Sequence, residues 1–221
     1  MQDFNATMER LIACNNQGAR CIERGDFPNA IRHLSFGIKT YKRTWRKLQP
    51  KKSSADAALT SIDIDEIMRK MPNDATDELS MYYYPVFFPE MDTSSNDVAG
   101  LFVTTITFNL ALSNHLYAIQ SGNKLCFRAA ARLYKHGFHL ERQRGNYSVS
   151  PFFLMATLNN LGLLYQVTKQ KDRSERCFRQ LLATLMYVVL SKGAQPSDLE
   201  RYFGNTSISL FNRQKKCAAA A

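Results

Sequence analysis

Histidine and cysteine are the residue types in this chain that could bind a metal or attack a substrate, but their spacing suits neither role. His136 and His139 lie one helical turn apart, and Cys126 lies roughly three turns earlier. No carboxylate completes a zinc site or a hydrolytic group with them. The five cysteines include no C-x-x-C pair. We therefore predict no catalytic residue, no metal and no cofactor, in a protein that is not an enzyme.

Basic side chains are the second group of candidates, because they bind phosphate or acidic polypeptides. One run extends from Lys39 to Lys52, with Tyr41 and Trp45 placed to stack on bases. This run and a second cluster supply the candidate basic patch: Lys42, Arg43, Arg46, Lys47, Arg128, Arg132 and Lys135. Four interpretations stay open: a solvated helix face, a nuclear-import signal, a phosphate-binding stripe, or a surface covered by the protein's own acidic insert.

Length and composition predict a folded protein with acidic partners. The 221 residues are 45% apolar, carry a formal charge of +10 and suffice for a single domain over 1–221. The chain begins without a basic and apolar leader, and no apolar run approaches the ~18 residues of a membrane span. We therefore expect no signal peptide, no transmembrane segment and an intracellular protein, cytoplasmic or nuclear.

Residues 53–98 differ from the rest of the chain and are predicted to form a long irregular insert. They hold ten acidic and two basic residues, and Pro72, Pro85 and Pro89 interrupt any long helix. Only residues 62–71 read as a short helix. The tract YYYPVFFP would be costly to leave in water. It is interpreted either as an extended strip over the protein's own core or as a segment that docks a partner.

On both sides of the insert, apolar residues recur with helical periodicity. Gly25-Asp26, Ser121-Gly122-Asn123 and the stretch from Arg144 to Pro151 interrupt it. The predicted helices cover residues 4–24, 27–48, 101–120, 124–142, 152–169 and 172–191, with a last helix over about 197–211.

Small and large residues recur at fixed intervals within these helix pairs. A small residue is followed after twelve positions by another and four positions later by a large one: Gly18, Ala30 and Leu34, then Gly162, Ser174 and Phe178. The middle pair has Ala111, Ala130 and Tyr134, with seven extra residues that two added helical turns would absorb. These intervals, with Leu161-Gly162 and Tyr165, resemble the tetratricopeptide family.

The resemblance implies an all-α fold, a right-handed α-α superhelix of tetratricopeptide-like helical hairpins with the insert after the first hairpin. Its units would cover residues 4–48, 101–143 and 152–191, and the helix over 197–211 would cap the last one. The segments FNLALSNHLYAI, LNNLGLLYQ and ERCFRQLLATLMYVV also resemble repeat proteins predicted in diatoms.

In tetratricopeptide arrays the first helix of each hairpin lines a concave groove, and the resemblance places asparagine at one groove position of every unit. An asparagine side chain offers both a donor and an acceptor, so such a row can hold a polypeptide backbone. The implied groove residues are Asn15, Asn16, Asn109, His115, Asn159, Asn160 and Gln166. The competing interpretation is that these asparagines only bridge neighbouring helices.

Together these features predict a non-catalytic protein-protein interaction scaffold or adaptor that binds a peptide or a partner helix in its groove. The alternative is an RNA-associated helical repeat protein that uses its basic helix faces. The first unit lacks an obvious cap, and either self-association or the aromatic insert is expected to cover it.

Overall fold

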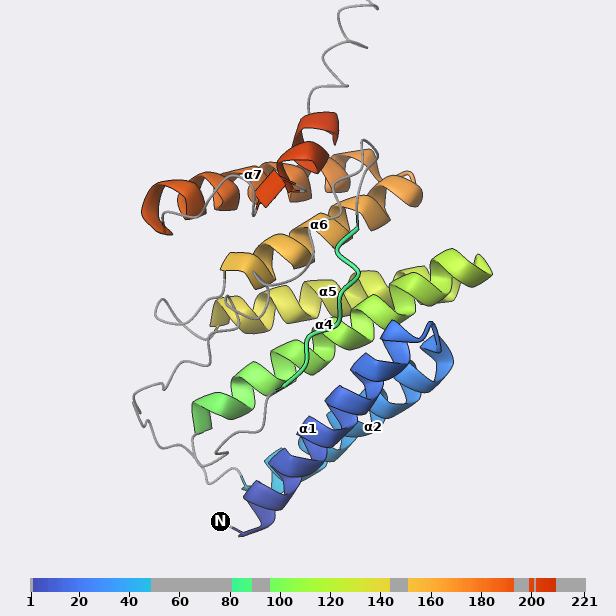
Figure 1. Ribbon diagram of the computed structural model, residues 1–221, viewed down its shortest axis with the longest axis vertical. Coiled ribbons are helices and arrows are strands. Elements are labelled where there is room, and N and C mark those ends of the chain that lie inside the picture. Colours follow the sequence, from blue (N-terminus) through green and yellow to red (C-terminus); the bar gives the residue numbers. More distant parts are fainter. Residues whose placement is uncertain are drawn as a thin grey trace, which may run out of the picture. The chain divides into compact units, whose positions relative to one another are not determined.

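Six helices account for most of the structure, a computed structural model that describes residues 2–48, 81–88, 96–143, 151–192, 199–200 and 202–209 (Figure 1). Their bounds are α1 Gln2–Glu23, α2 Phe27–Leu48, α4 Asn96–Ser121, α5 Lys124–Gln143, α6 Pro151–Val167 and α7 Lys171–Lys192. Residues 202–209 are also helical, and no strand occurs in the described part of the chain. The all-α prediction is confirmed for these residues.

The helix ends lie within two residues of the predicted ones, except at the start of α4. Helix α4 begins at Asn96 instead of residue 101, so residues 96–98 of the predicted insert belong to a helix. Helix α6 ends at Val167 instead of residue 169, because the chain turns at Lys169 with a φ of 59°. The predicted helix over 62–71 and most of the insert lie outside the described residues.

Contacts divide the chain into two compact units, where the sequence predicted one domain over residues 1–221. Unit 1 comprises Met1–Ile62 and Tyr83–Ser148, and unit 2 comprises Asp63–Tyr82 and Val149–Ala221. In unit 1, α1 packs on α2 and α4 packs on α5, while α2 also packs on α4. In unit 2, α6 packs on α7. Each of these sequential pairs is a hairpin joined by a short turn.

Helix α4 forms the interior of unit 1, because its middle part is buried around the whole circumference. Every residue from Thr104 to His115 is buried. Helices α2 and α5 instead bury one stripe and expose charged residues on the other side. The outer helices therefore face solvent, and the inner helix carries the polar side chains that must find partners inside the protein.

In the first and last hairpins, the two helices approach closely at the small residues that the sequence spacing predicted, Gly18 and Gly162. A Cβ atom on Gly18 would lie 2.5 Å from Leu34 Cγ, and one on Gly162 would lie 2.9 Å from the Phe178 ring. Ser174 Oγ donates a 2.9 Å hydrogen bond to the Gly162 carbonyl oxygen. The same packing scheme, one large side chain over one glycine, thus recurs in both units.

The middle hairpin is longer than the other two at the end that carries its turn. Gly25 and Lys169 turn the chain with φ of 72° and 59°, each seven residues after its close-approach glycine. Gly122 does so with φ of 67°, eleven residues after Ala111. The seven extra residues are therefore divided, four before the turn and three after it. They lengthen α4 and α5 by about one turn each.

Substituting Gly18 by Ala tests the close approach of α1 and α2. We expect Gly18→Ala to lower the free energy of unfolding by about 1–3 kcal/mol, because Leu34 is fully buried and has no space to move. Urea unfolding followed by circular dichroism measures this change. Gly204→Ala is the control, since a Cβ there meets nothing within 4 Å. Equal stabilities for both variants would contradict the packing scheme.

Candidate functional site

Asn109 of α4 holds both backbone polar groups of one residue in the extended segment 81–88. The Val86 N–H donates to Asn109 Oδ1 over 2.9 Å, and Asn109 Nδ2 donates to the Val86 carbonyl oxygen over 2.8 Å. A carboxamide matches this pair because it places a donor and an acceptor side by side. Asn109 is fully buried. Its side chain therefore satisfies two backbone groups that would otherwise be buried without partners.

Asn16 of α1 makes the same paired contact two residues further along the segment. The Phe88 N–H donates to Asn16 Oδ1 over 2.9 Å, and Asn16 Nδ2 donates to the Phe88 carbonyl oxygen over 2.8 Å. In an extended chain, residues two positions apart present the same edge. The two asparagines therefore form hydrogen bonds with the same edge of the segment.

Asn15 connects these two side chains into one network within unit 1. Its Oδ1 accepts a 2.8 Å hydrogen bond from Asn109 Nδ2, and its Nδ2 donates to the Val86 carbonyl oxygen over 2.9 Å. A weaker contact of 3.3 Å joins Asn15 Nδ2 to Asn16 Oδ1. We call Asn15, Asn16 and Asn109 the asparagine ladder. The ladder links α1 to α4 and fixes the orientation of each amide.

Two side chains of the segment fill the space beside the asparagine ladder. Val86 is 1% exposed and Phe88 is 5% exposed. The Phe88 ring meets Phe102 of α4 edge to face, with 4.2 Å between ring centroids. Tyr83 is exposed and Phe87 half-buried. The asparagine ladder binds the backbone of the segment. The apolar side chains at alternate positions are buried, and this burial stabilises the contact.

Unit 2 contains the same arrangement around Tyr82. The Tyr82 N–H donates to Asn160 Oδ1 over 2.8 Å, and Asn160 Nδ2 donates to the Tyr82 carbonyl oxygen over 2.6 Å. Asn159 Nδ2 contacts Asn160 Oδ1 at 3.4 Å, and Asn159 Oδ1 accepts a hydrogen bond from Asn205 Nδ2. Asn159, Asn160 and Asn205 therefore correspond to Asn15, Asn16 and Asn109.

Asn205 is a site residue that the sequence analysis did not identify. It lies in the helical stretch 202–209, which was predicted only as a cap. A signal was present, because each asparagine of this kind stands two positions before a small residue: Asn16 and Gly18, Asn109 and Ala111, Asn160 and Gly162, Asn205 and Ser207. An asparagine pair therefore joins the stretch 202–209 to α6, through Asn205 and Asn159. The pair Asn109 and Asn15 joins α4 to α1 in the same way.

Two predicted groove residues contact helices instead of the segment 81–88. His115 is 1% exposed and packs edge to face on Phe127 and Tyr134 of α5. The residues added to α4 and α5 next to their turn place Phe127 against His115. Gln166 is half-buried and its Nε2 contacts Ser209 Oγ at 3.4 Å. It faces the stretch 202–209.

The candidate basic patch lies on the outer helices of unit 1. Lys42 and Arg43 are exposed on α2, and Arg128, Arg132 and Lys135 are exposed on α5. Arg46 and Lys47 belong to α2, but their side chains lie outside the described part. The basic residues are therefore separate from the asparagine ladder, which lies on α1 and α4.

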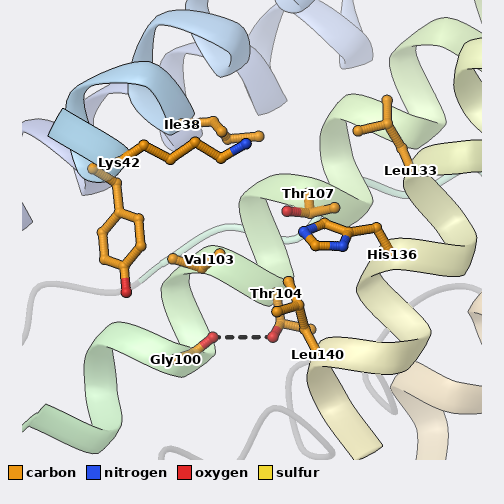
Figure 2. A pocket seen from close by; sticks show the side chains of 10 residues that line it. Ile38, Lys42, Gly100, Val103, Thr104, Thr107, Leu133, His136 and Leu140 are labelled. Atoms are coloured by element: carbon orange, nitrogen blue, oxygen red, sulfur yellow. Dashed lines mark hydrogen bonds between the residues drawn. The ribbon is translucent and has the colours of Figure 1, made fainter. Parts of the chain in front are cut away.

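Part of this basic patch borders a cavity of about 320 Å³ between α2, α4 and α5. Its walls include Ile38, Val103, Leu133 and Leu140, and Lys42, Thr107 and His136 lie around it (Figure 2). Burial is the main cause of the lowered pKa of His136, and the charges of Lys42 and His139 lower it further. The lining of this cavity is therefore mostly apolar, and Lys42 brings a positive charge to its edge.

No group of three or more His, Cys, Asp or Glu side chains in the described ranges is placed to hold a metal ion. Burial raises the pKa of Cys177 to about 12, which keeps its thiol protonated and unreactive. Among the residues that the structure describes, no helix combines the length and the apolar character needed to cross a membrane.

Comparisons of the chain with protein-family models, with curated proteins and with solved structures found no match. The class of protein must therefore be argued from the helical hairpins and the asparagine contacts themselves.

Substituting Asn109 by Ala tests the asparagine ladder as a structural network. We expect Asn109→Ala to lower the free energy of unfolding by about 2–3 kcal/mol, because Val86 N–H and Asn15 Oδ1 lose buried partners. Amide hydrogen exchange at Val86 should also accelerate. Asn114→Ala is the matched control, since Asn114 is buried in the same helix and donates only within it, to Leu110. Similar losses for both variants would count against the network.

The buried His115 predicts a loss of stability in acid. Burial lowers the pKa of His115 from 6.5 to about 4, so its neutral form is favoured in the folded protein. The stability from this shift is complete above pH 6.5 and is lost as the pH falls towards about 4, by roughly 3 kcal/mol. Urea unfolding at several pH values should show a smaller loss for His115→Phe. An identical pH dependence would refute the assignment.

Proposed function

We propose that the chain is a non-catalytic protein-interaction scaffold that holds an extended polypeptide by asparagine side chains of its inner helices. The observation that supports this most directly is the repeated paired contact, in which one carboxamide bonds both backbone groups of one residue. It occurs at Asn109 with Val86, at Asn16 with Phe88 and at Asn160 with Tyr82.

The chemistry of these contacts favours a polypeptide over other ligands. Every residue except proline offers an N–H and a C=O with the spacing that one carboxamide matches. Binding through these groups is independent of side-chain identity and suits a scaffold with several partners. The neighbouring space for Val86 and Phe88 adds affinity, since burying such a side chain is worth about 1.5–3 kcal/mol.

The packing of the hairpins supports a tetratricopeptide-like architecture within this proposal. The close-approach glycines, the large residues opposite them and the turns seven residues later follow the intervals of that family in α1 and α2 and in α6 and α7. In such an architecture, the first helices of successive hairpins form the inner layer of a right-handed superhelix. The asparagines lie on α1, α4 and α6, which are these first helices.

A binding experiment on an emptied site tests the proposal. In the variant Val86→Gly/Phe88→Gly, called the emptied variant, the internal segment loses the side chains that anchor it. We expect this variant to bind a fluorescent peptide with the sequence of residues 81–88, made soluble by added glutamates. A Kd of about 10 µM corresponds to two buried side chains and a few backbone hydrogen bonds. Fluorescence anisotropy measures it.

Asn109→Ala in the emptied variant is the control for the binding mode, and it should weaken peptide binding at least about 10-fold. Circular dichroism verifies that both proteins stay helical. A helical emptied variant that does not bind the peptide, or that binds it equally well without Asn109, would refute the proposed function. Labelled single-stranded RNA, added in a parallel titration, tests the RNA-associated alternative through its salt dependence.

A further inference from the structure

We infer that residues 83–88 are an internal ligand of unit 1, which an external polypeptide with a Val-x-Phe sequence and acidic flanks displaces. This inference rests on the proposed function and adds to it both a regulatory state and the chemistry of the partner. In the structure the asparagine ladder is occupied by the chain's own Val86 and Phe88. The intact chain is therefore in a closed state.

The contacts that hold the segment are ones that another polypeptide can reproduce. Five hydrogen bonds join the backbone of Val86 and Phe88 to asparagine side chains. Residues 81–88 belong to no helix or strand. What is particular to this segment is the pair of buried side chains at alternate positions, Val86 and Phe88. A partner must supply those two side chains and two free N–H groups.

The two prolines of the segment indicate where a binding sequence can carry proline. Pro85 precedes the first bonded residue, and Pro89 follows the second in the sequence. Proline has no N–H and favours extended backbone at its own position and the one before it. It is therefore compatible with the residues beside the bonded ones and excluded from the bonded ones. A competing segment can therefore carry proline beside the two bonded residues but not at them.

Charge complementarity specifies the flanks of the partner. Residues 53–98 carry a net charge of −8, so the rest of the chain carries +10 − (−8) = +18. Exposed basic residues of α2 and α5 belong to this remainder, Arg43 and Arg132 among them. The displaced segment and its acidic neighbours stay attached, so an incoming segment meets a chain that still carries a net charge of +10. Acidic flanks therefore accelerate its association and strengthen its binding at low salt.

Covalent connection gives the internal segment its advantage over a free peptide. A covalently attached ligand has an effective concentration on the order of 1 mM. For a free peptide with a Kd of about 10 µM, such a competitor weakens the apparent affinity by about 100-fold. A partner displaces the internal segment if it binds more tightly or is present at a high local concentration. A free peptide at low concentration does not displace it.

Comparing the intact chain with the emptied variant tests the inference. With the fluorescent peptide of residues 81–88, we expect the intact chain to bind about 100-fold more weakly than the emptied variant. The matched control is Tyr83→Gly/Phe87→Gly, which removes two large side chains from the other face of the same segment. This control should bind as weakly as the intact chain.

Each outcome of this comparison decides a separate claim. If the intact chain binds the peptide as tightly as the emptied variant, the internal ligand is refuted and the proposed function stands. If neither protein binds it while both are helical, the proposed function fails. If the emptied variant unfolds, hydrogen exchange on the intact chain decides instead. An excess of unlabelled peptide should then accelerate exchange at the internal Val86 and Phe88 amides, and unchanged exchange overturns the inference.

Discussion

The structure of the site depends on one physical constraint, that a backbone N–H or C=O buried away from water must have a hydrogen-bond partner. The segment around Val86 and Phe88 lies in no helix or strand, so no regular ladder satisfies its backbone. The carboxamides of Asn16 and Asn109 take over this role, one for each residue. Because these groups are satisfied, the apolar side chains of Val86 and Phe88 can be buried at little polar cost. Packing and polar contacts in unit 1 are therefore coupled.

The same constraint explains why asparagine occurs inside helices that are otherwise apolar. An asparagine buried on α4 without partners would cost about 1–3 kcal/mol for each unsatisfied group. Asn109 avoids this cost because Asn15 and Val86 are both within hydrogen-bond distance. In unit 2, Asn159 and Asn160 do so with Asn205 and Tyr82. Each set links two helices to each other and to an extended backbone of the same chain, so one residue type satisfies both kinds of contact.

Much of the helical scaffold could be predicted from local patterns. The turn at Gly25 and the spacing of Gly18 to Leu34 depend on short stretches of chain, and both occur as expected. The lengthened middle hairpin was predicted from seven extra residues, although only the structure shows that four precede Gly122 and three follow it. His115 was assigned to the groove by analogy with shorter hairpins. The added turn of α5 places Phe127 against it, a contact that no interval within α4 indicates.

The sequence by itself determined the helices, the close approaches within the first and last hairpins, and the presence of one asparagine at the same position in the first helix of every hairpin. These features arise from periodicity and spacing over a few tens of residues. Only the tertiary structure decided what the asparagines hold, because Asn16 and Phe88 are 72 positions apart and no local pattern joins them. It also decided that Asn205 belongs to the same set, since its role depends on contact with Asn159. A carboxamide is equally suited to a neighbouring helix, to an external peptide and to the chain itself. Which of these is its partner depends on which backbone reaches it in the fold.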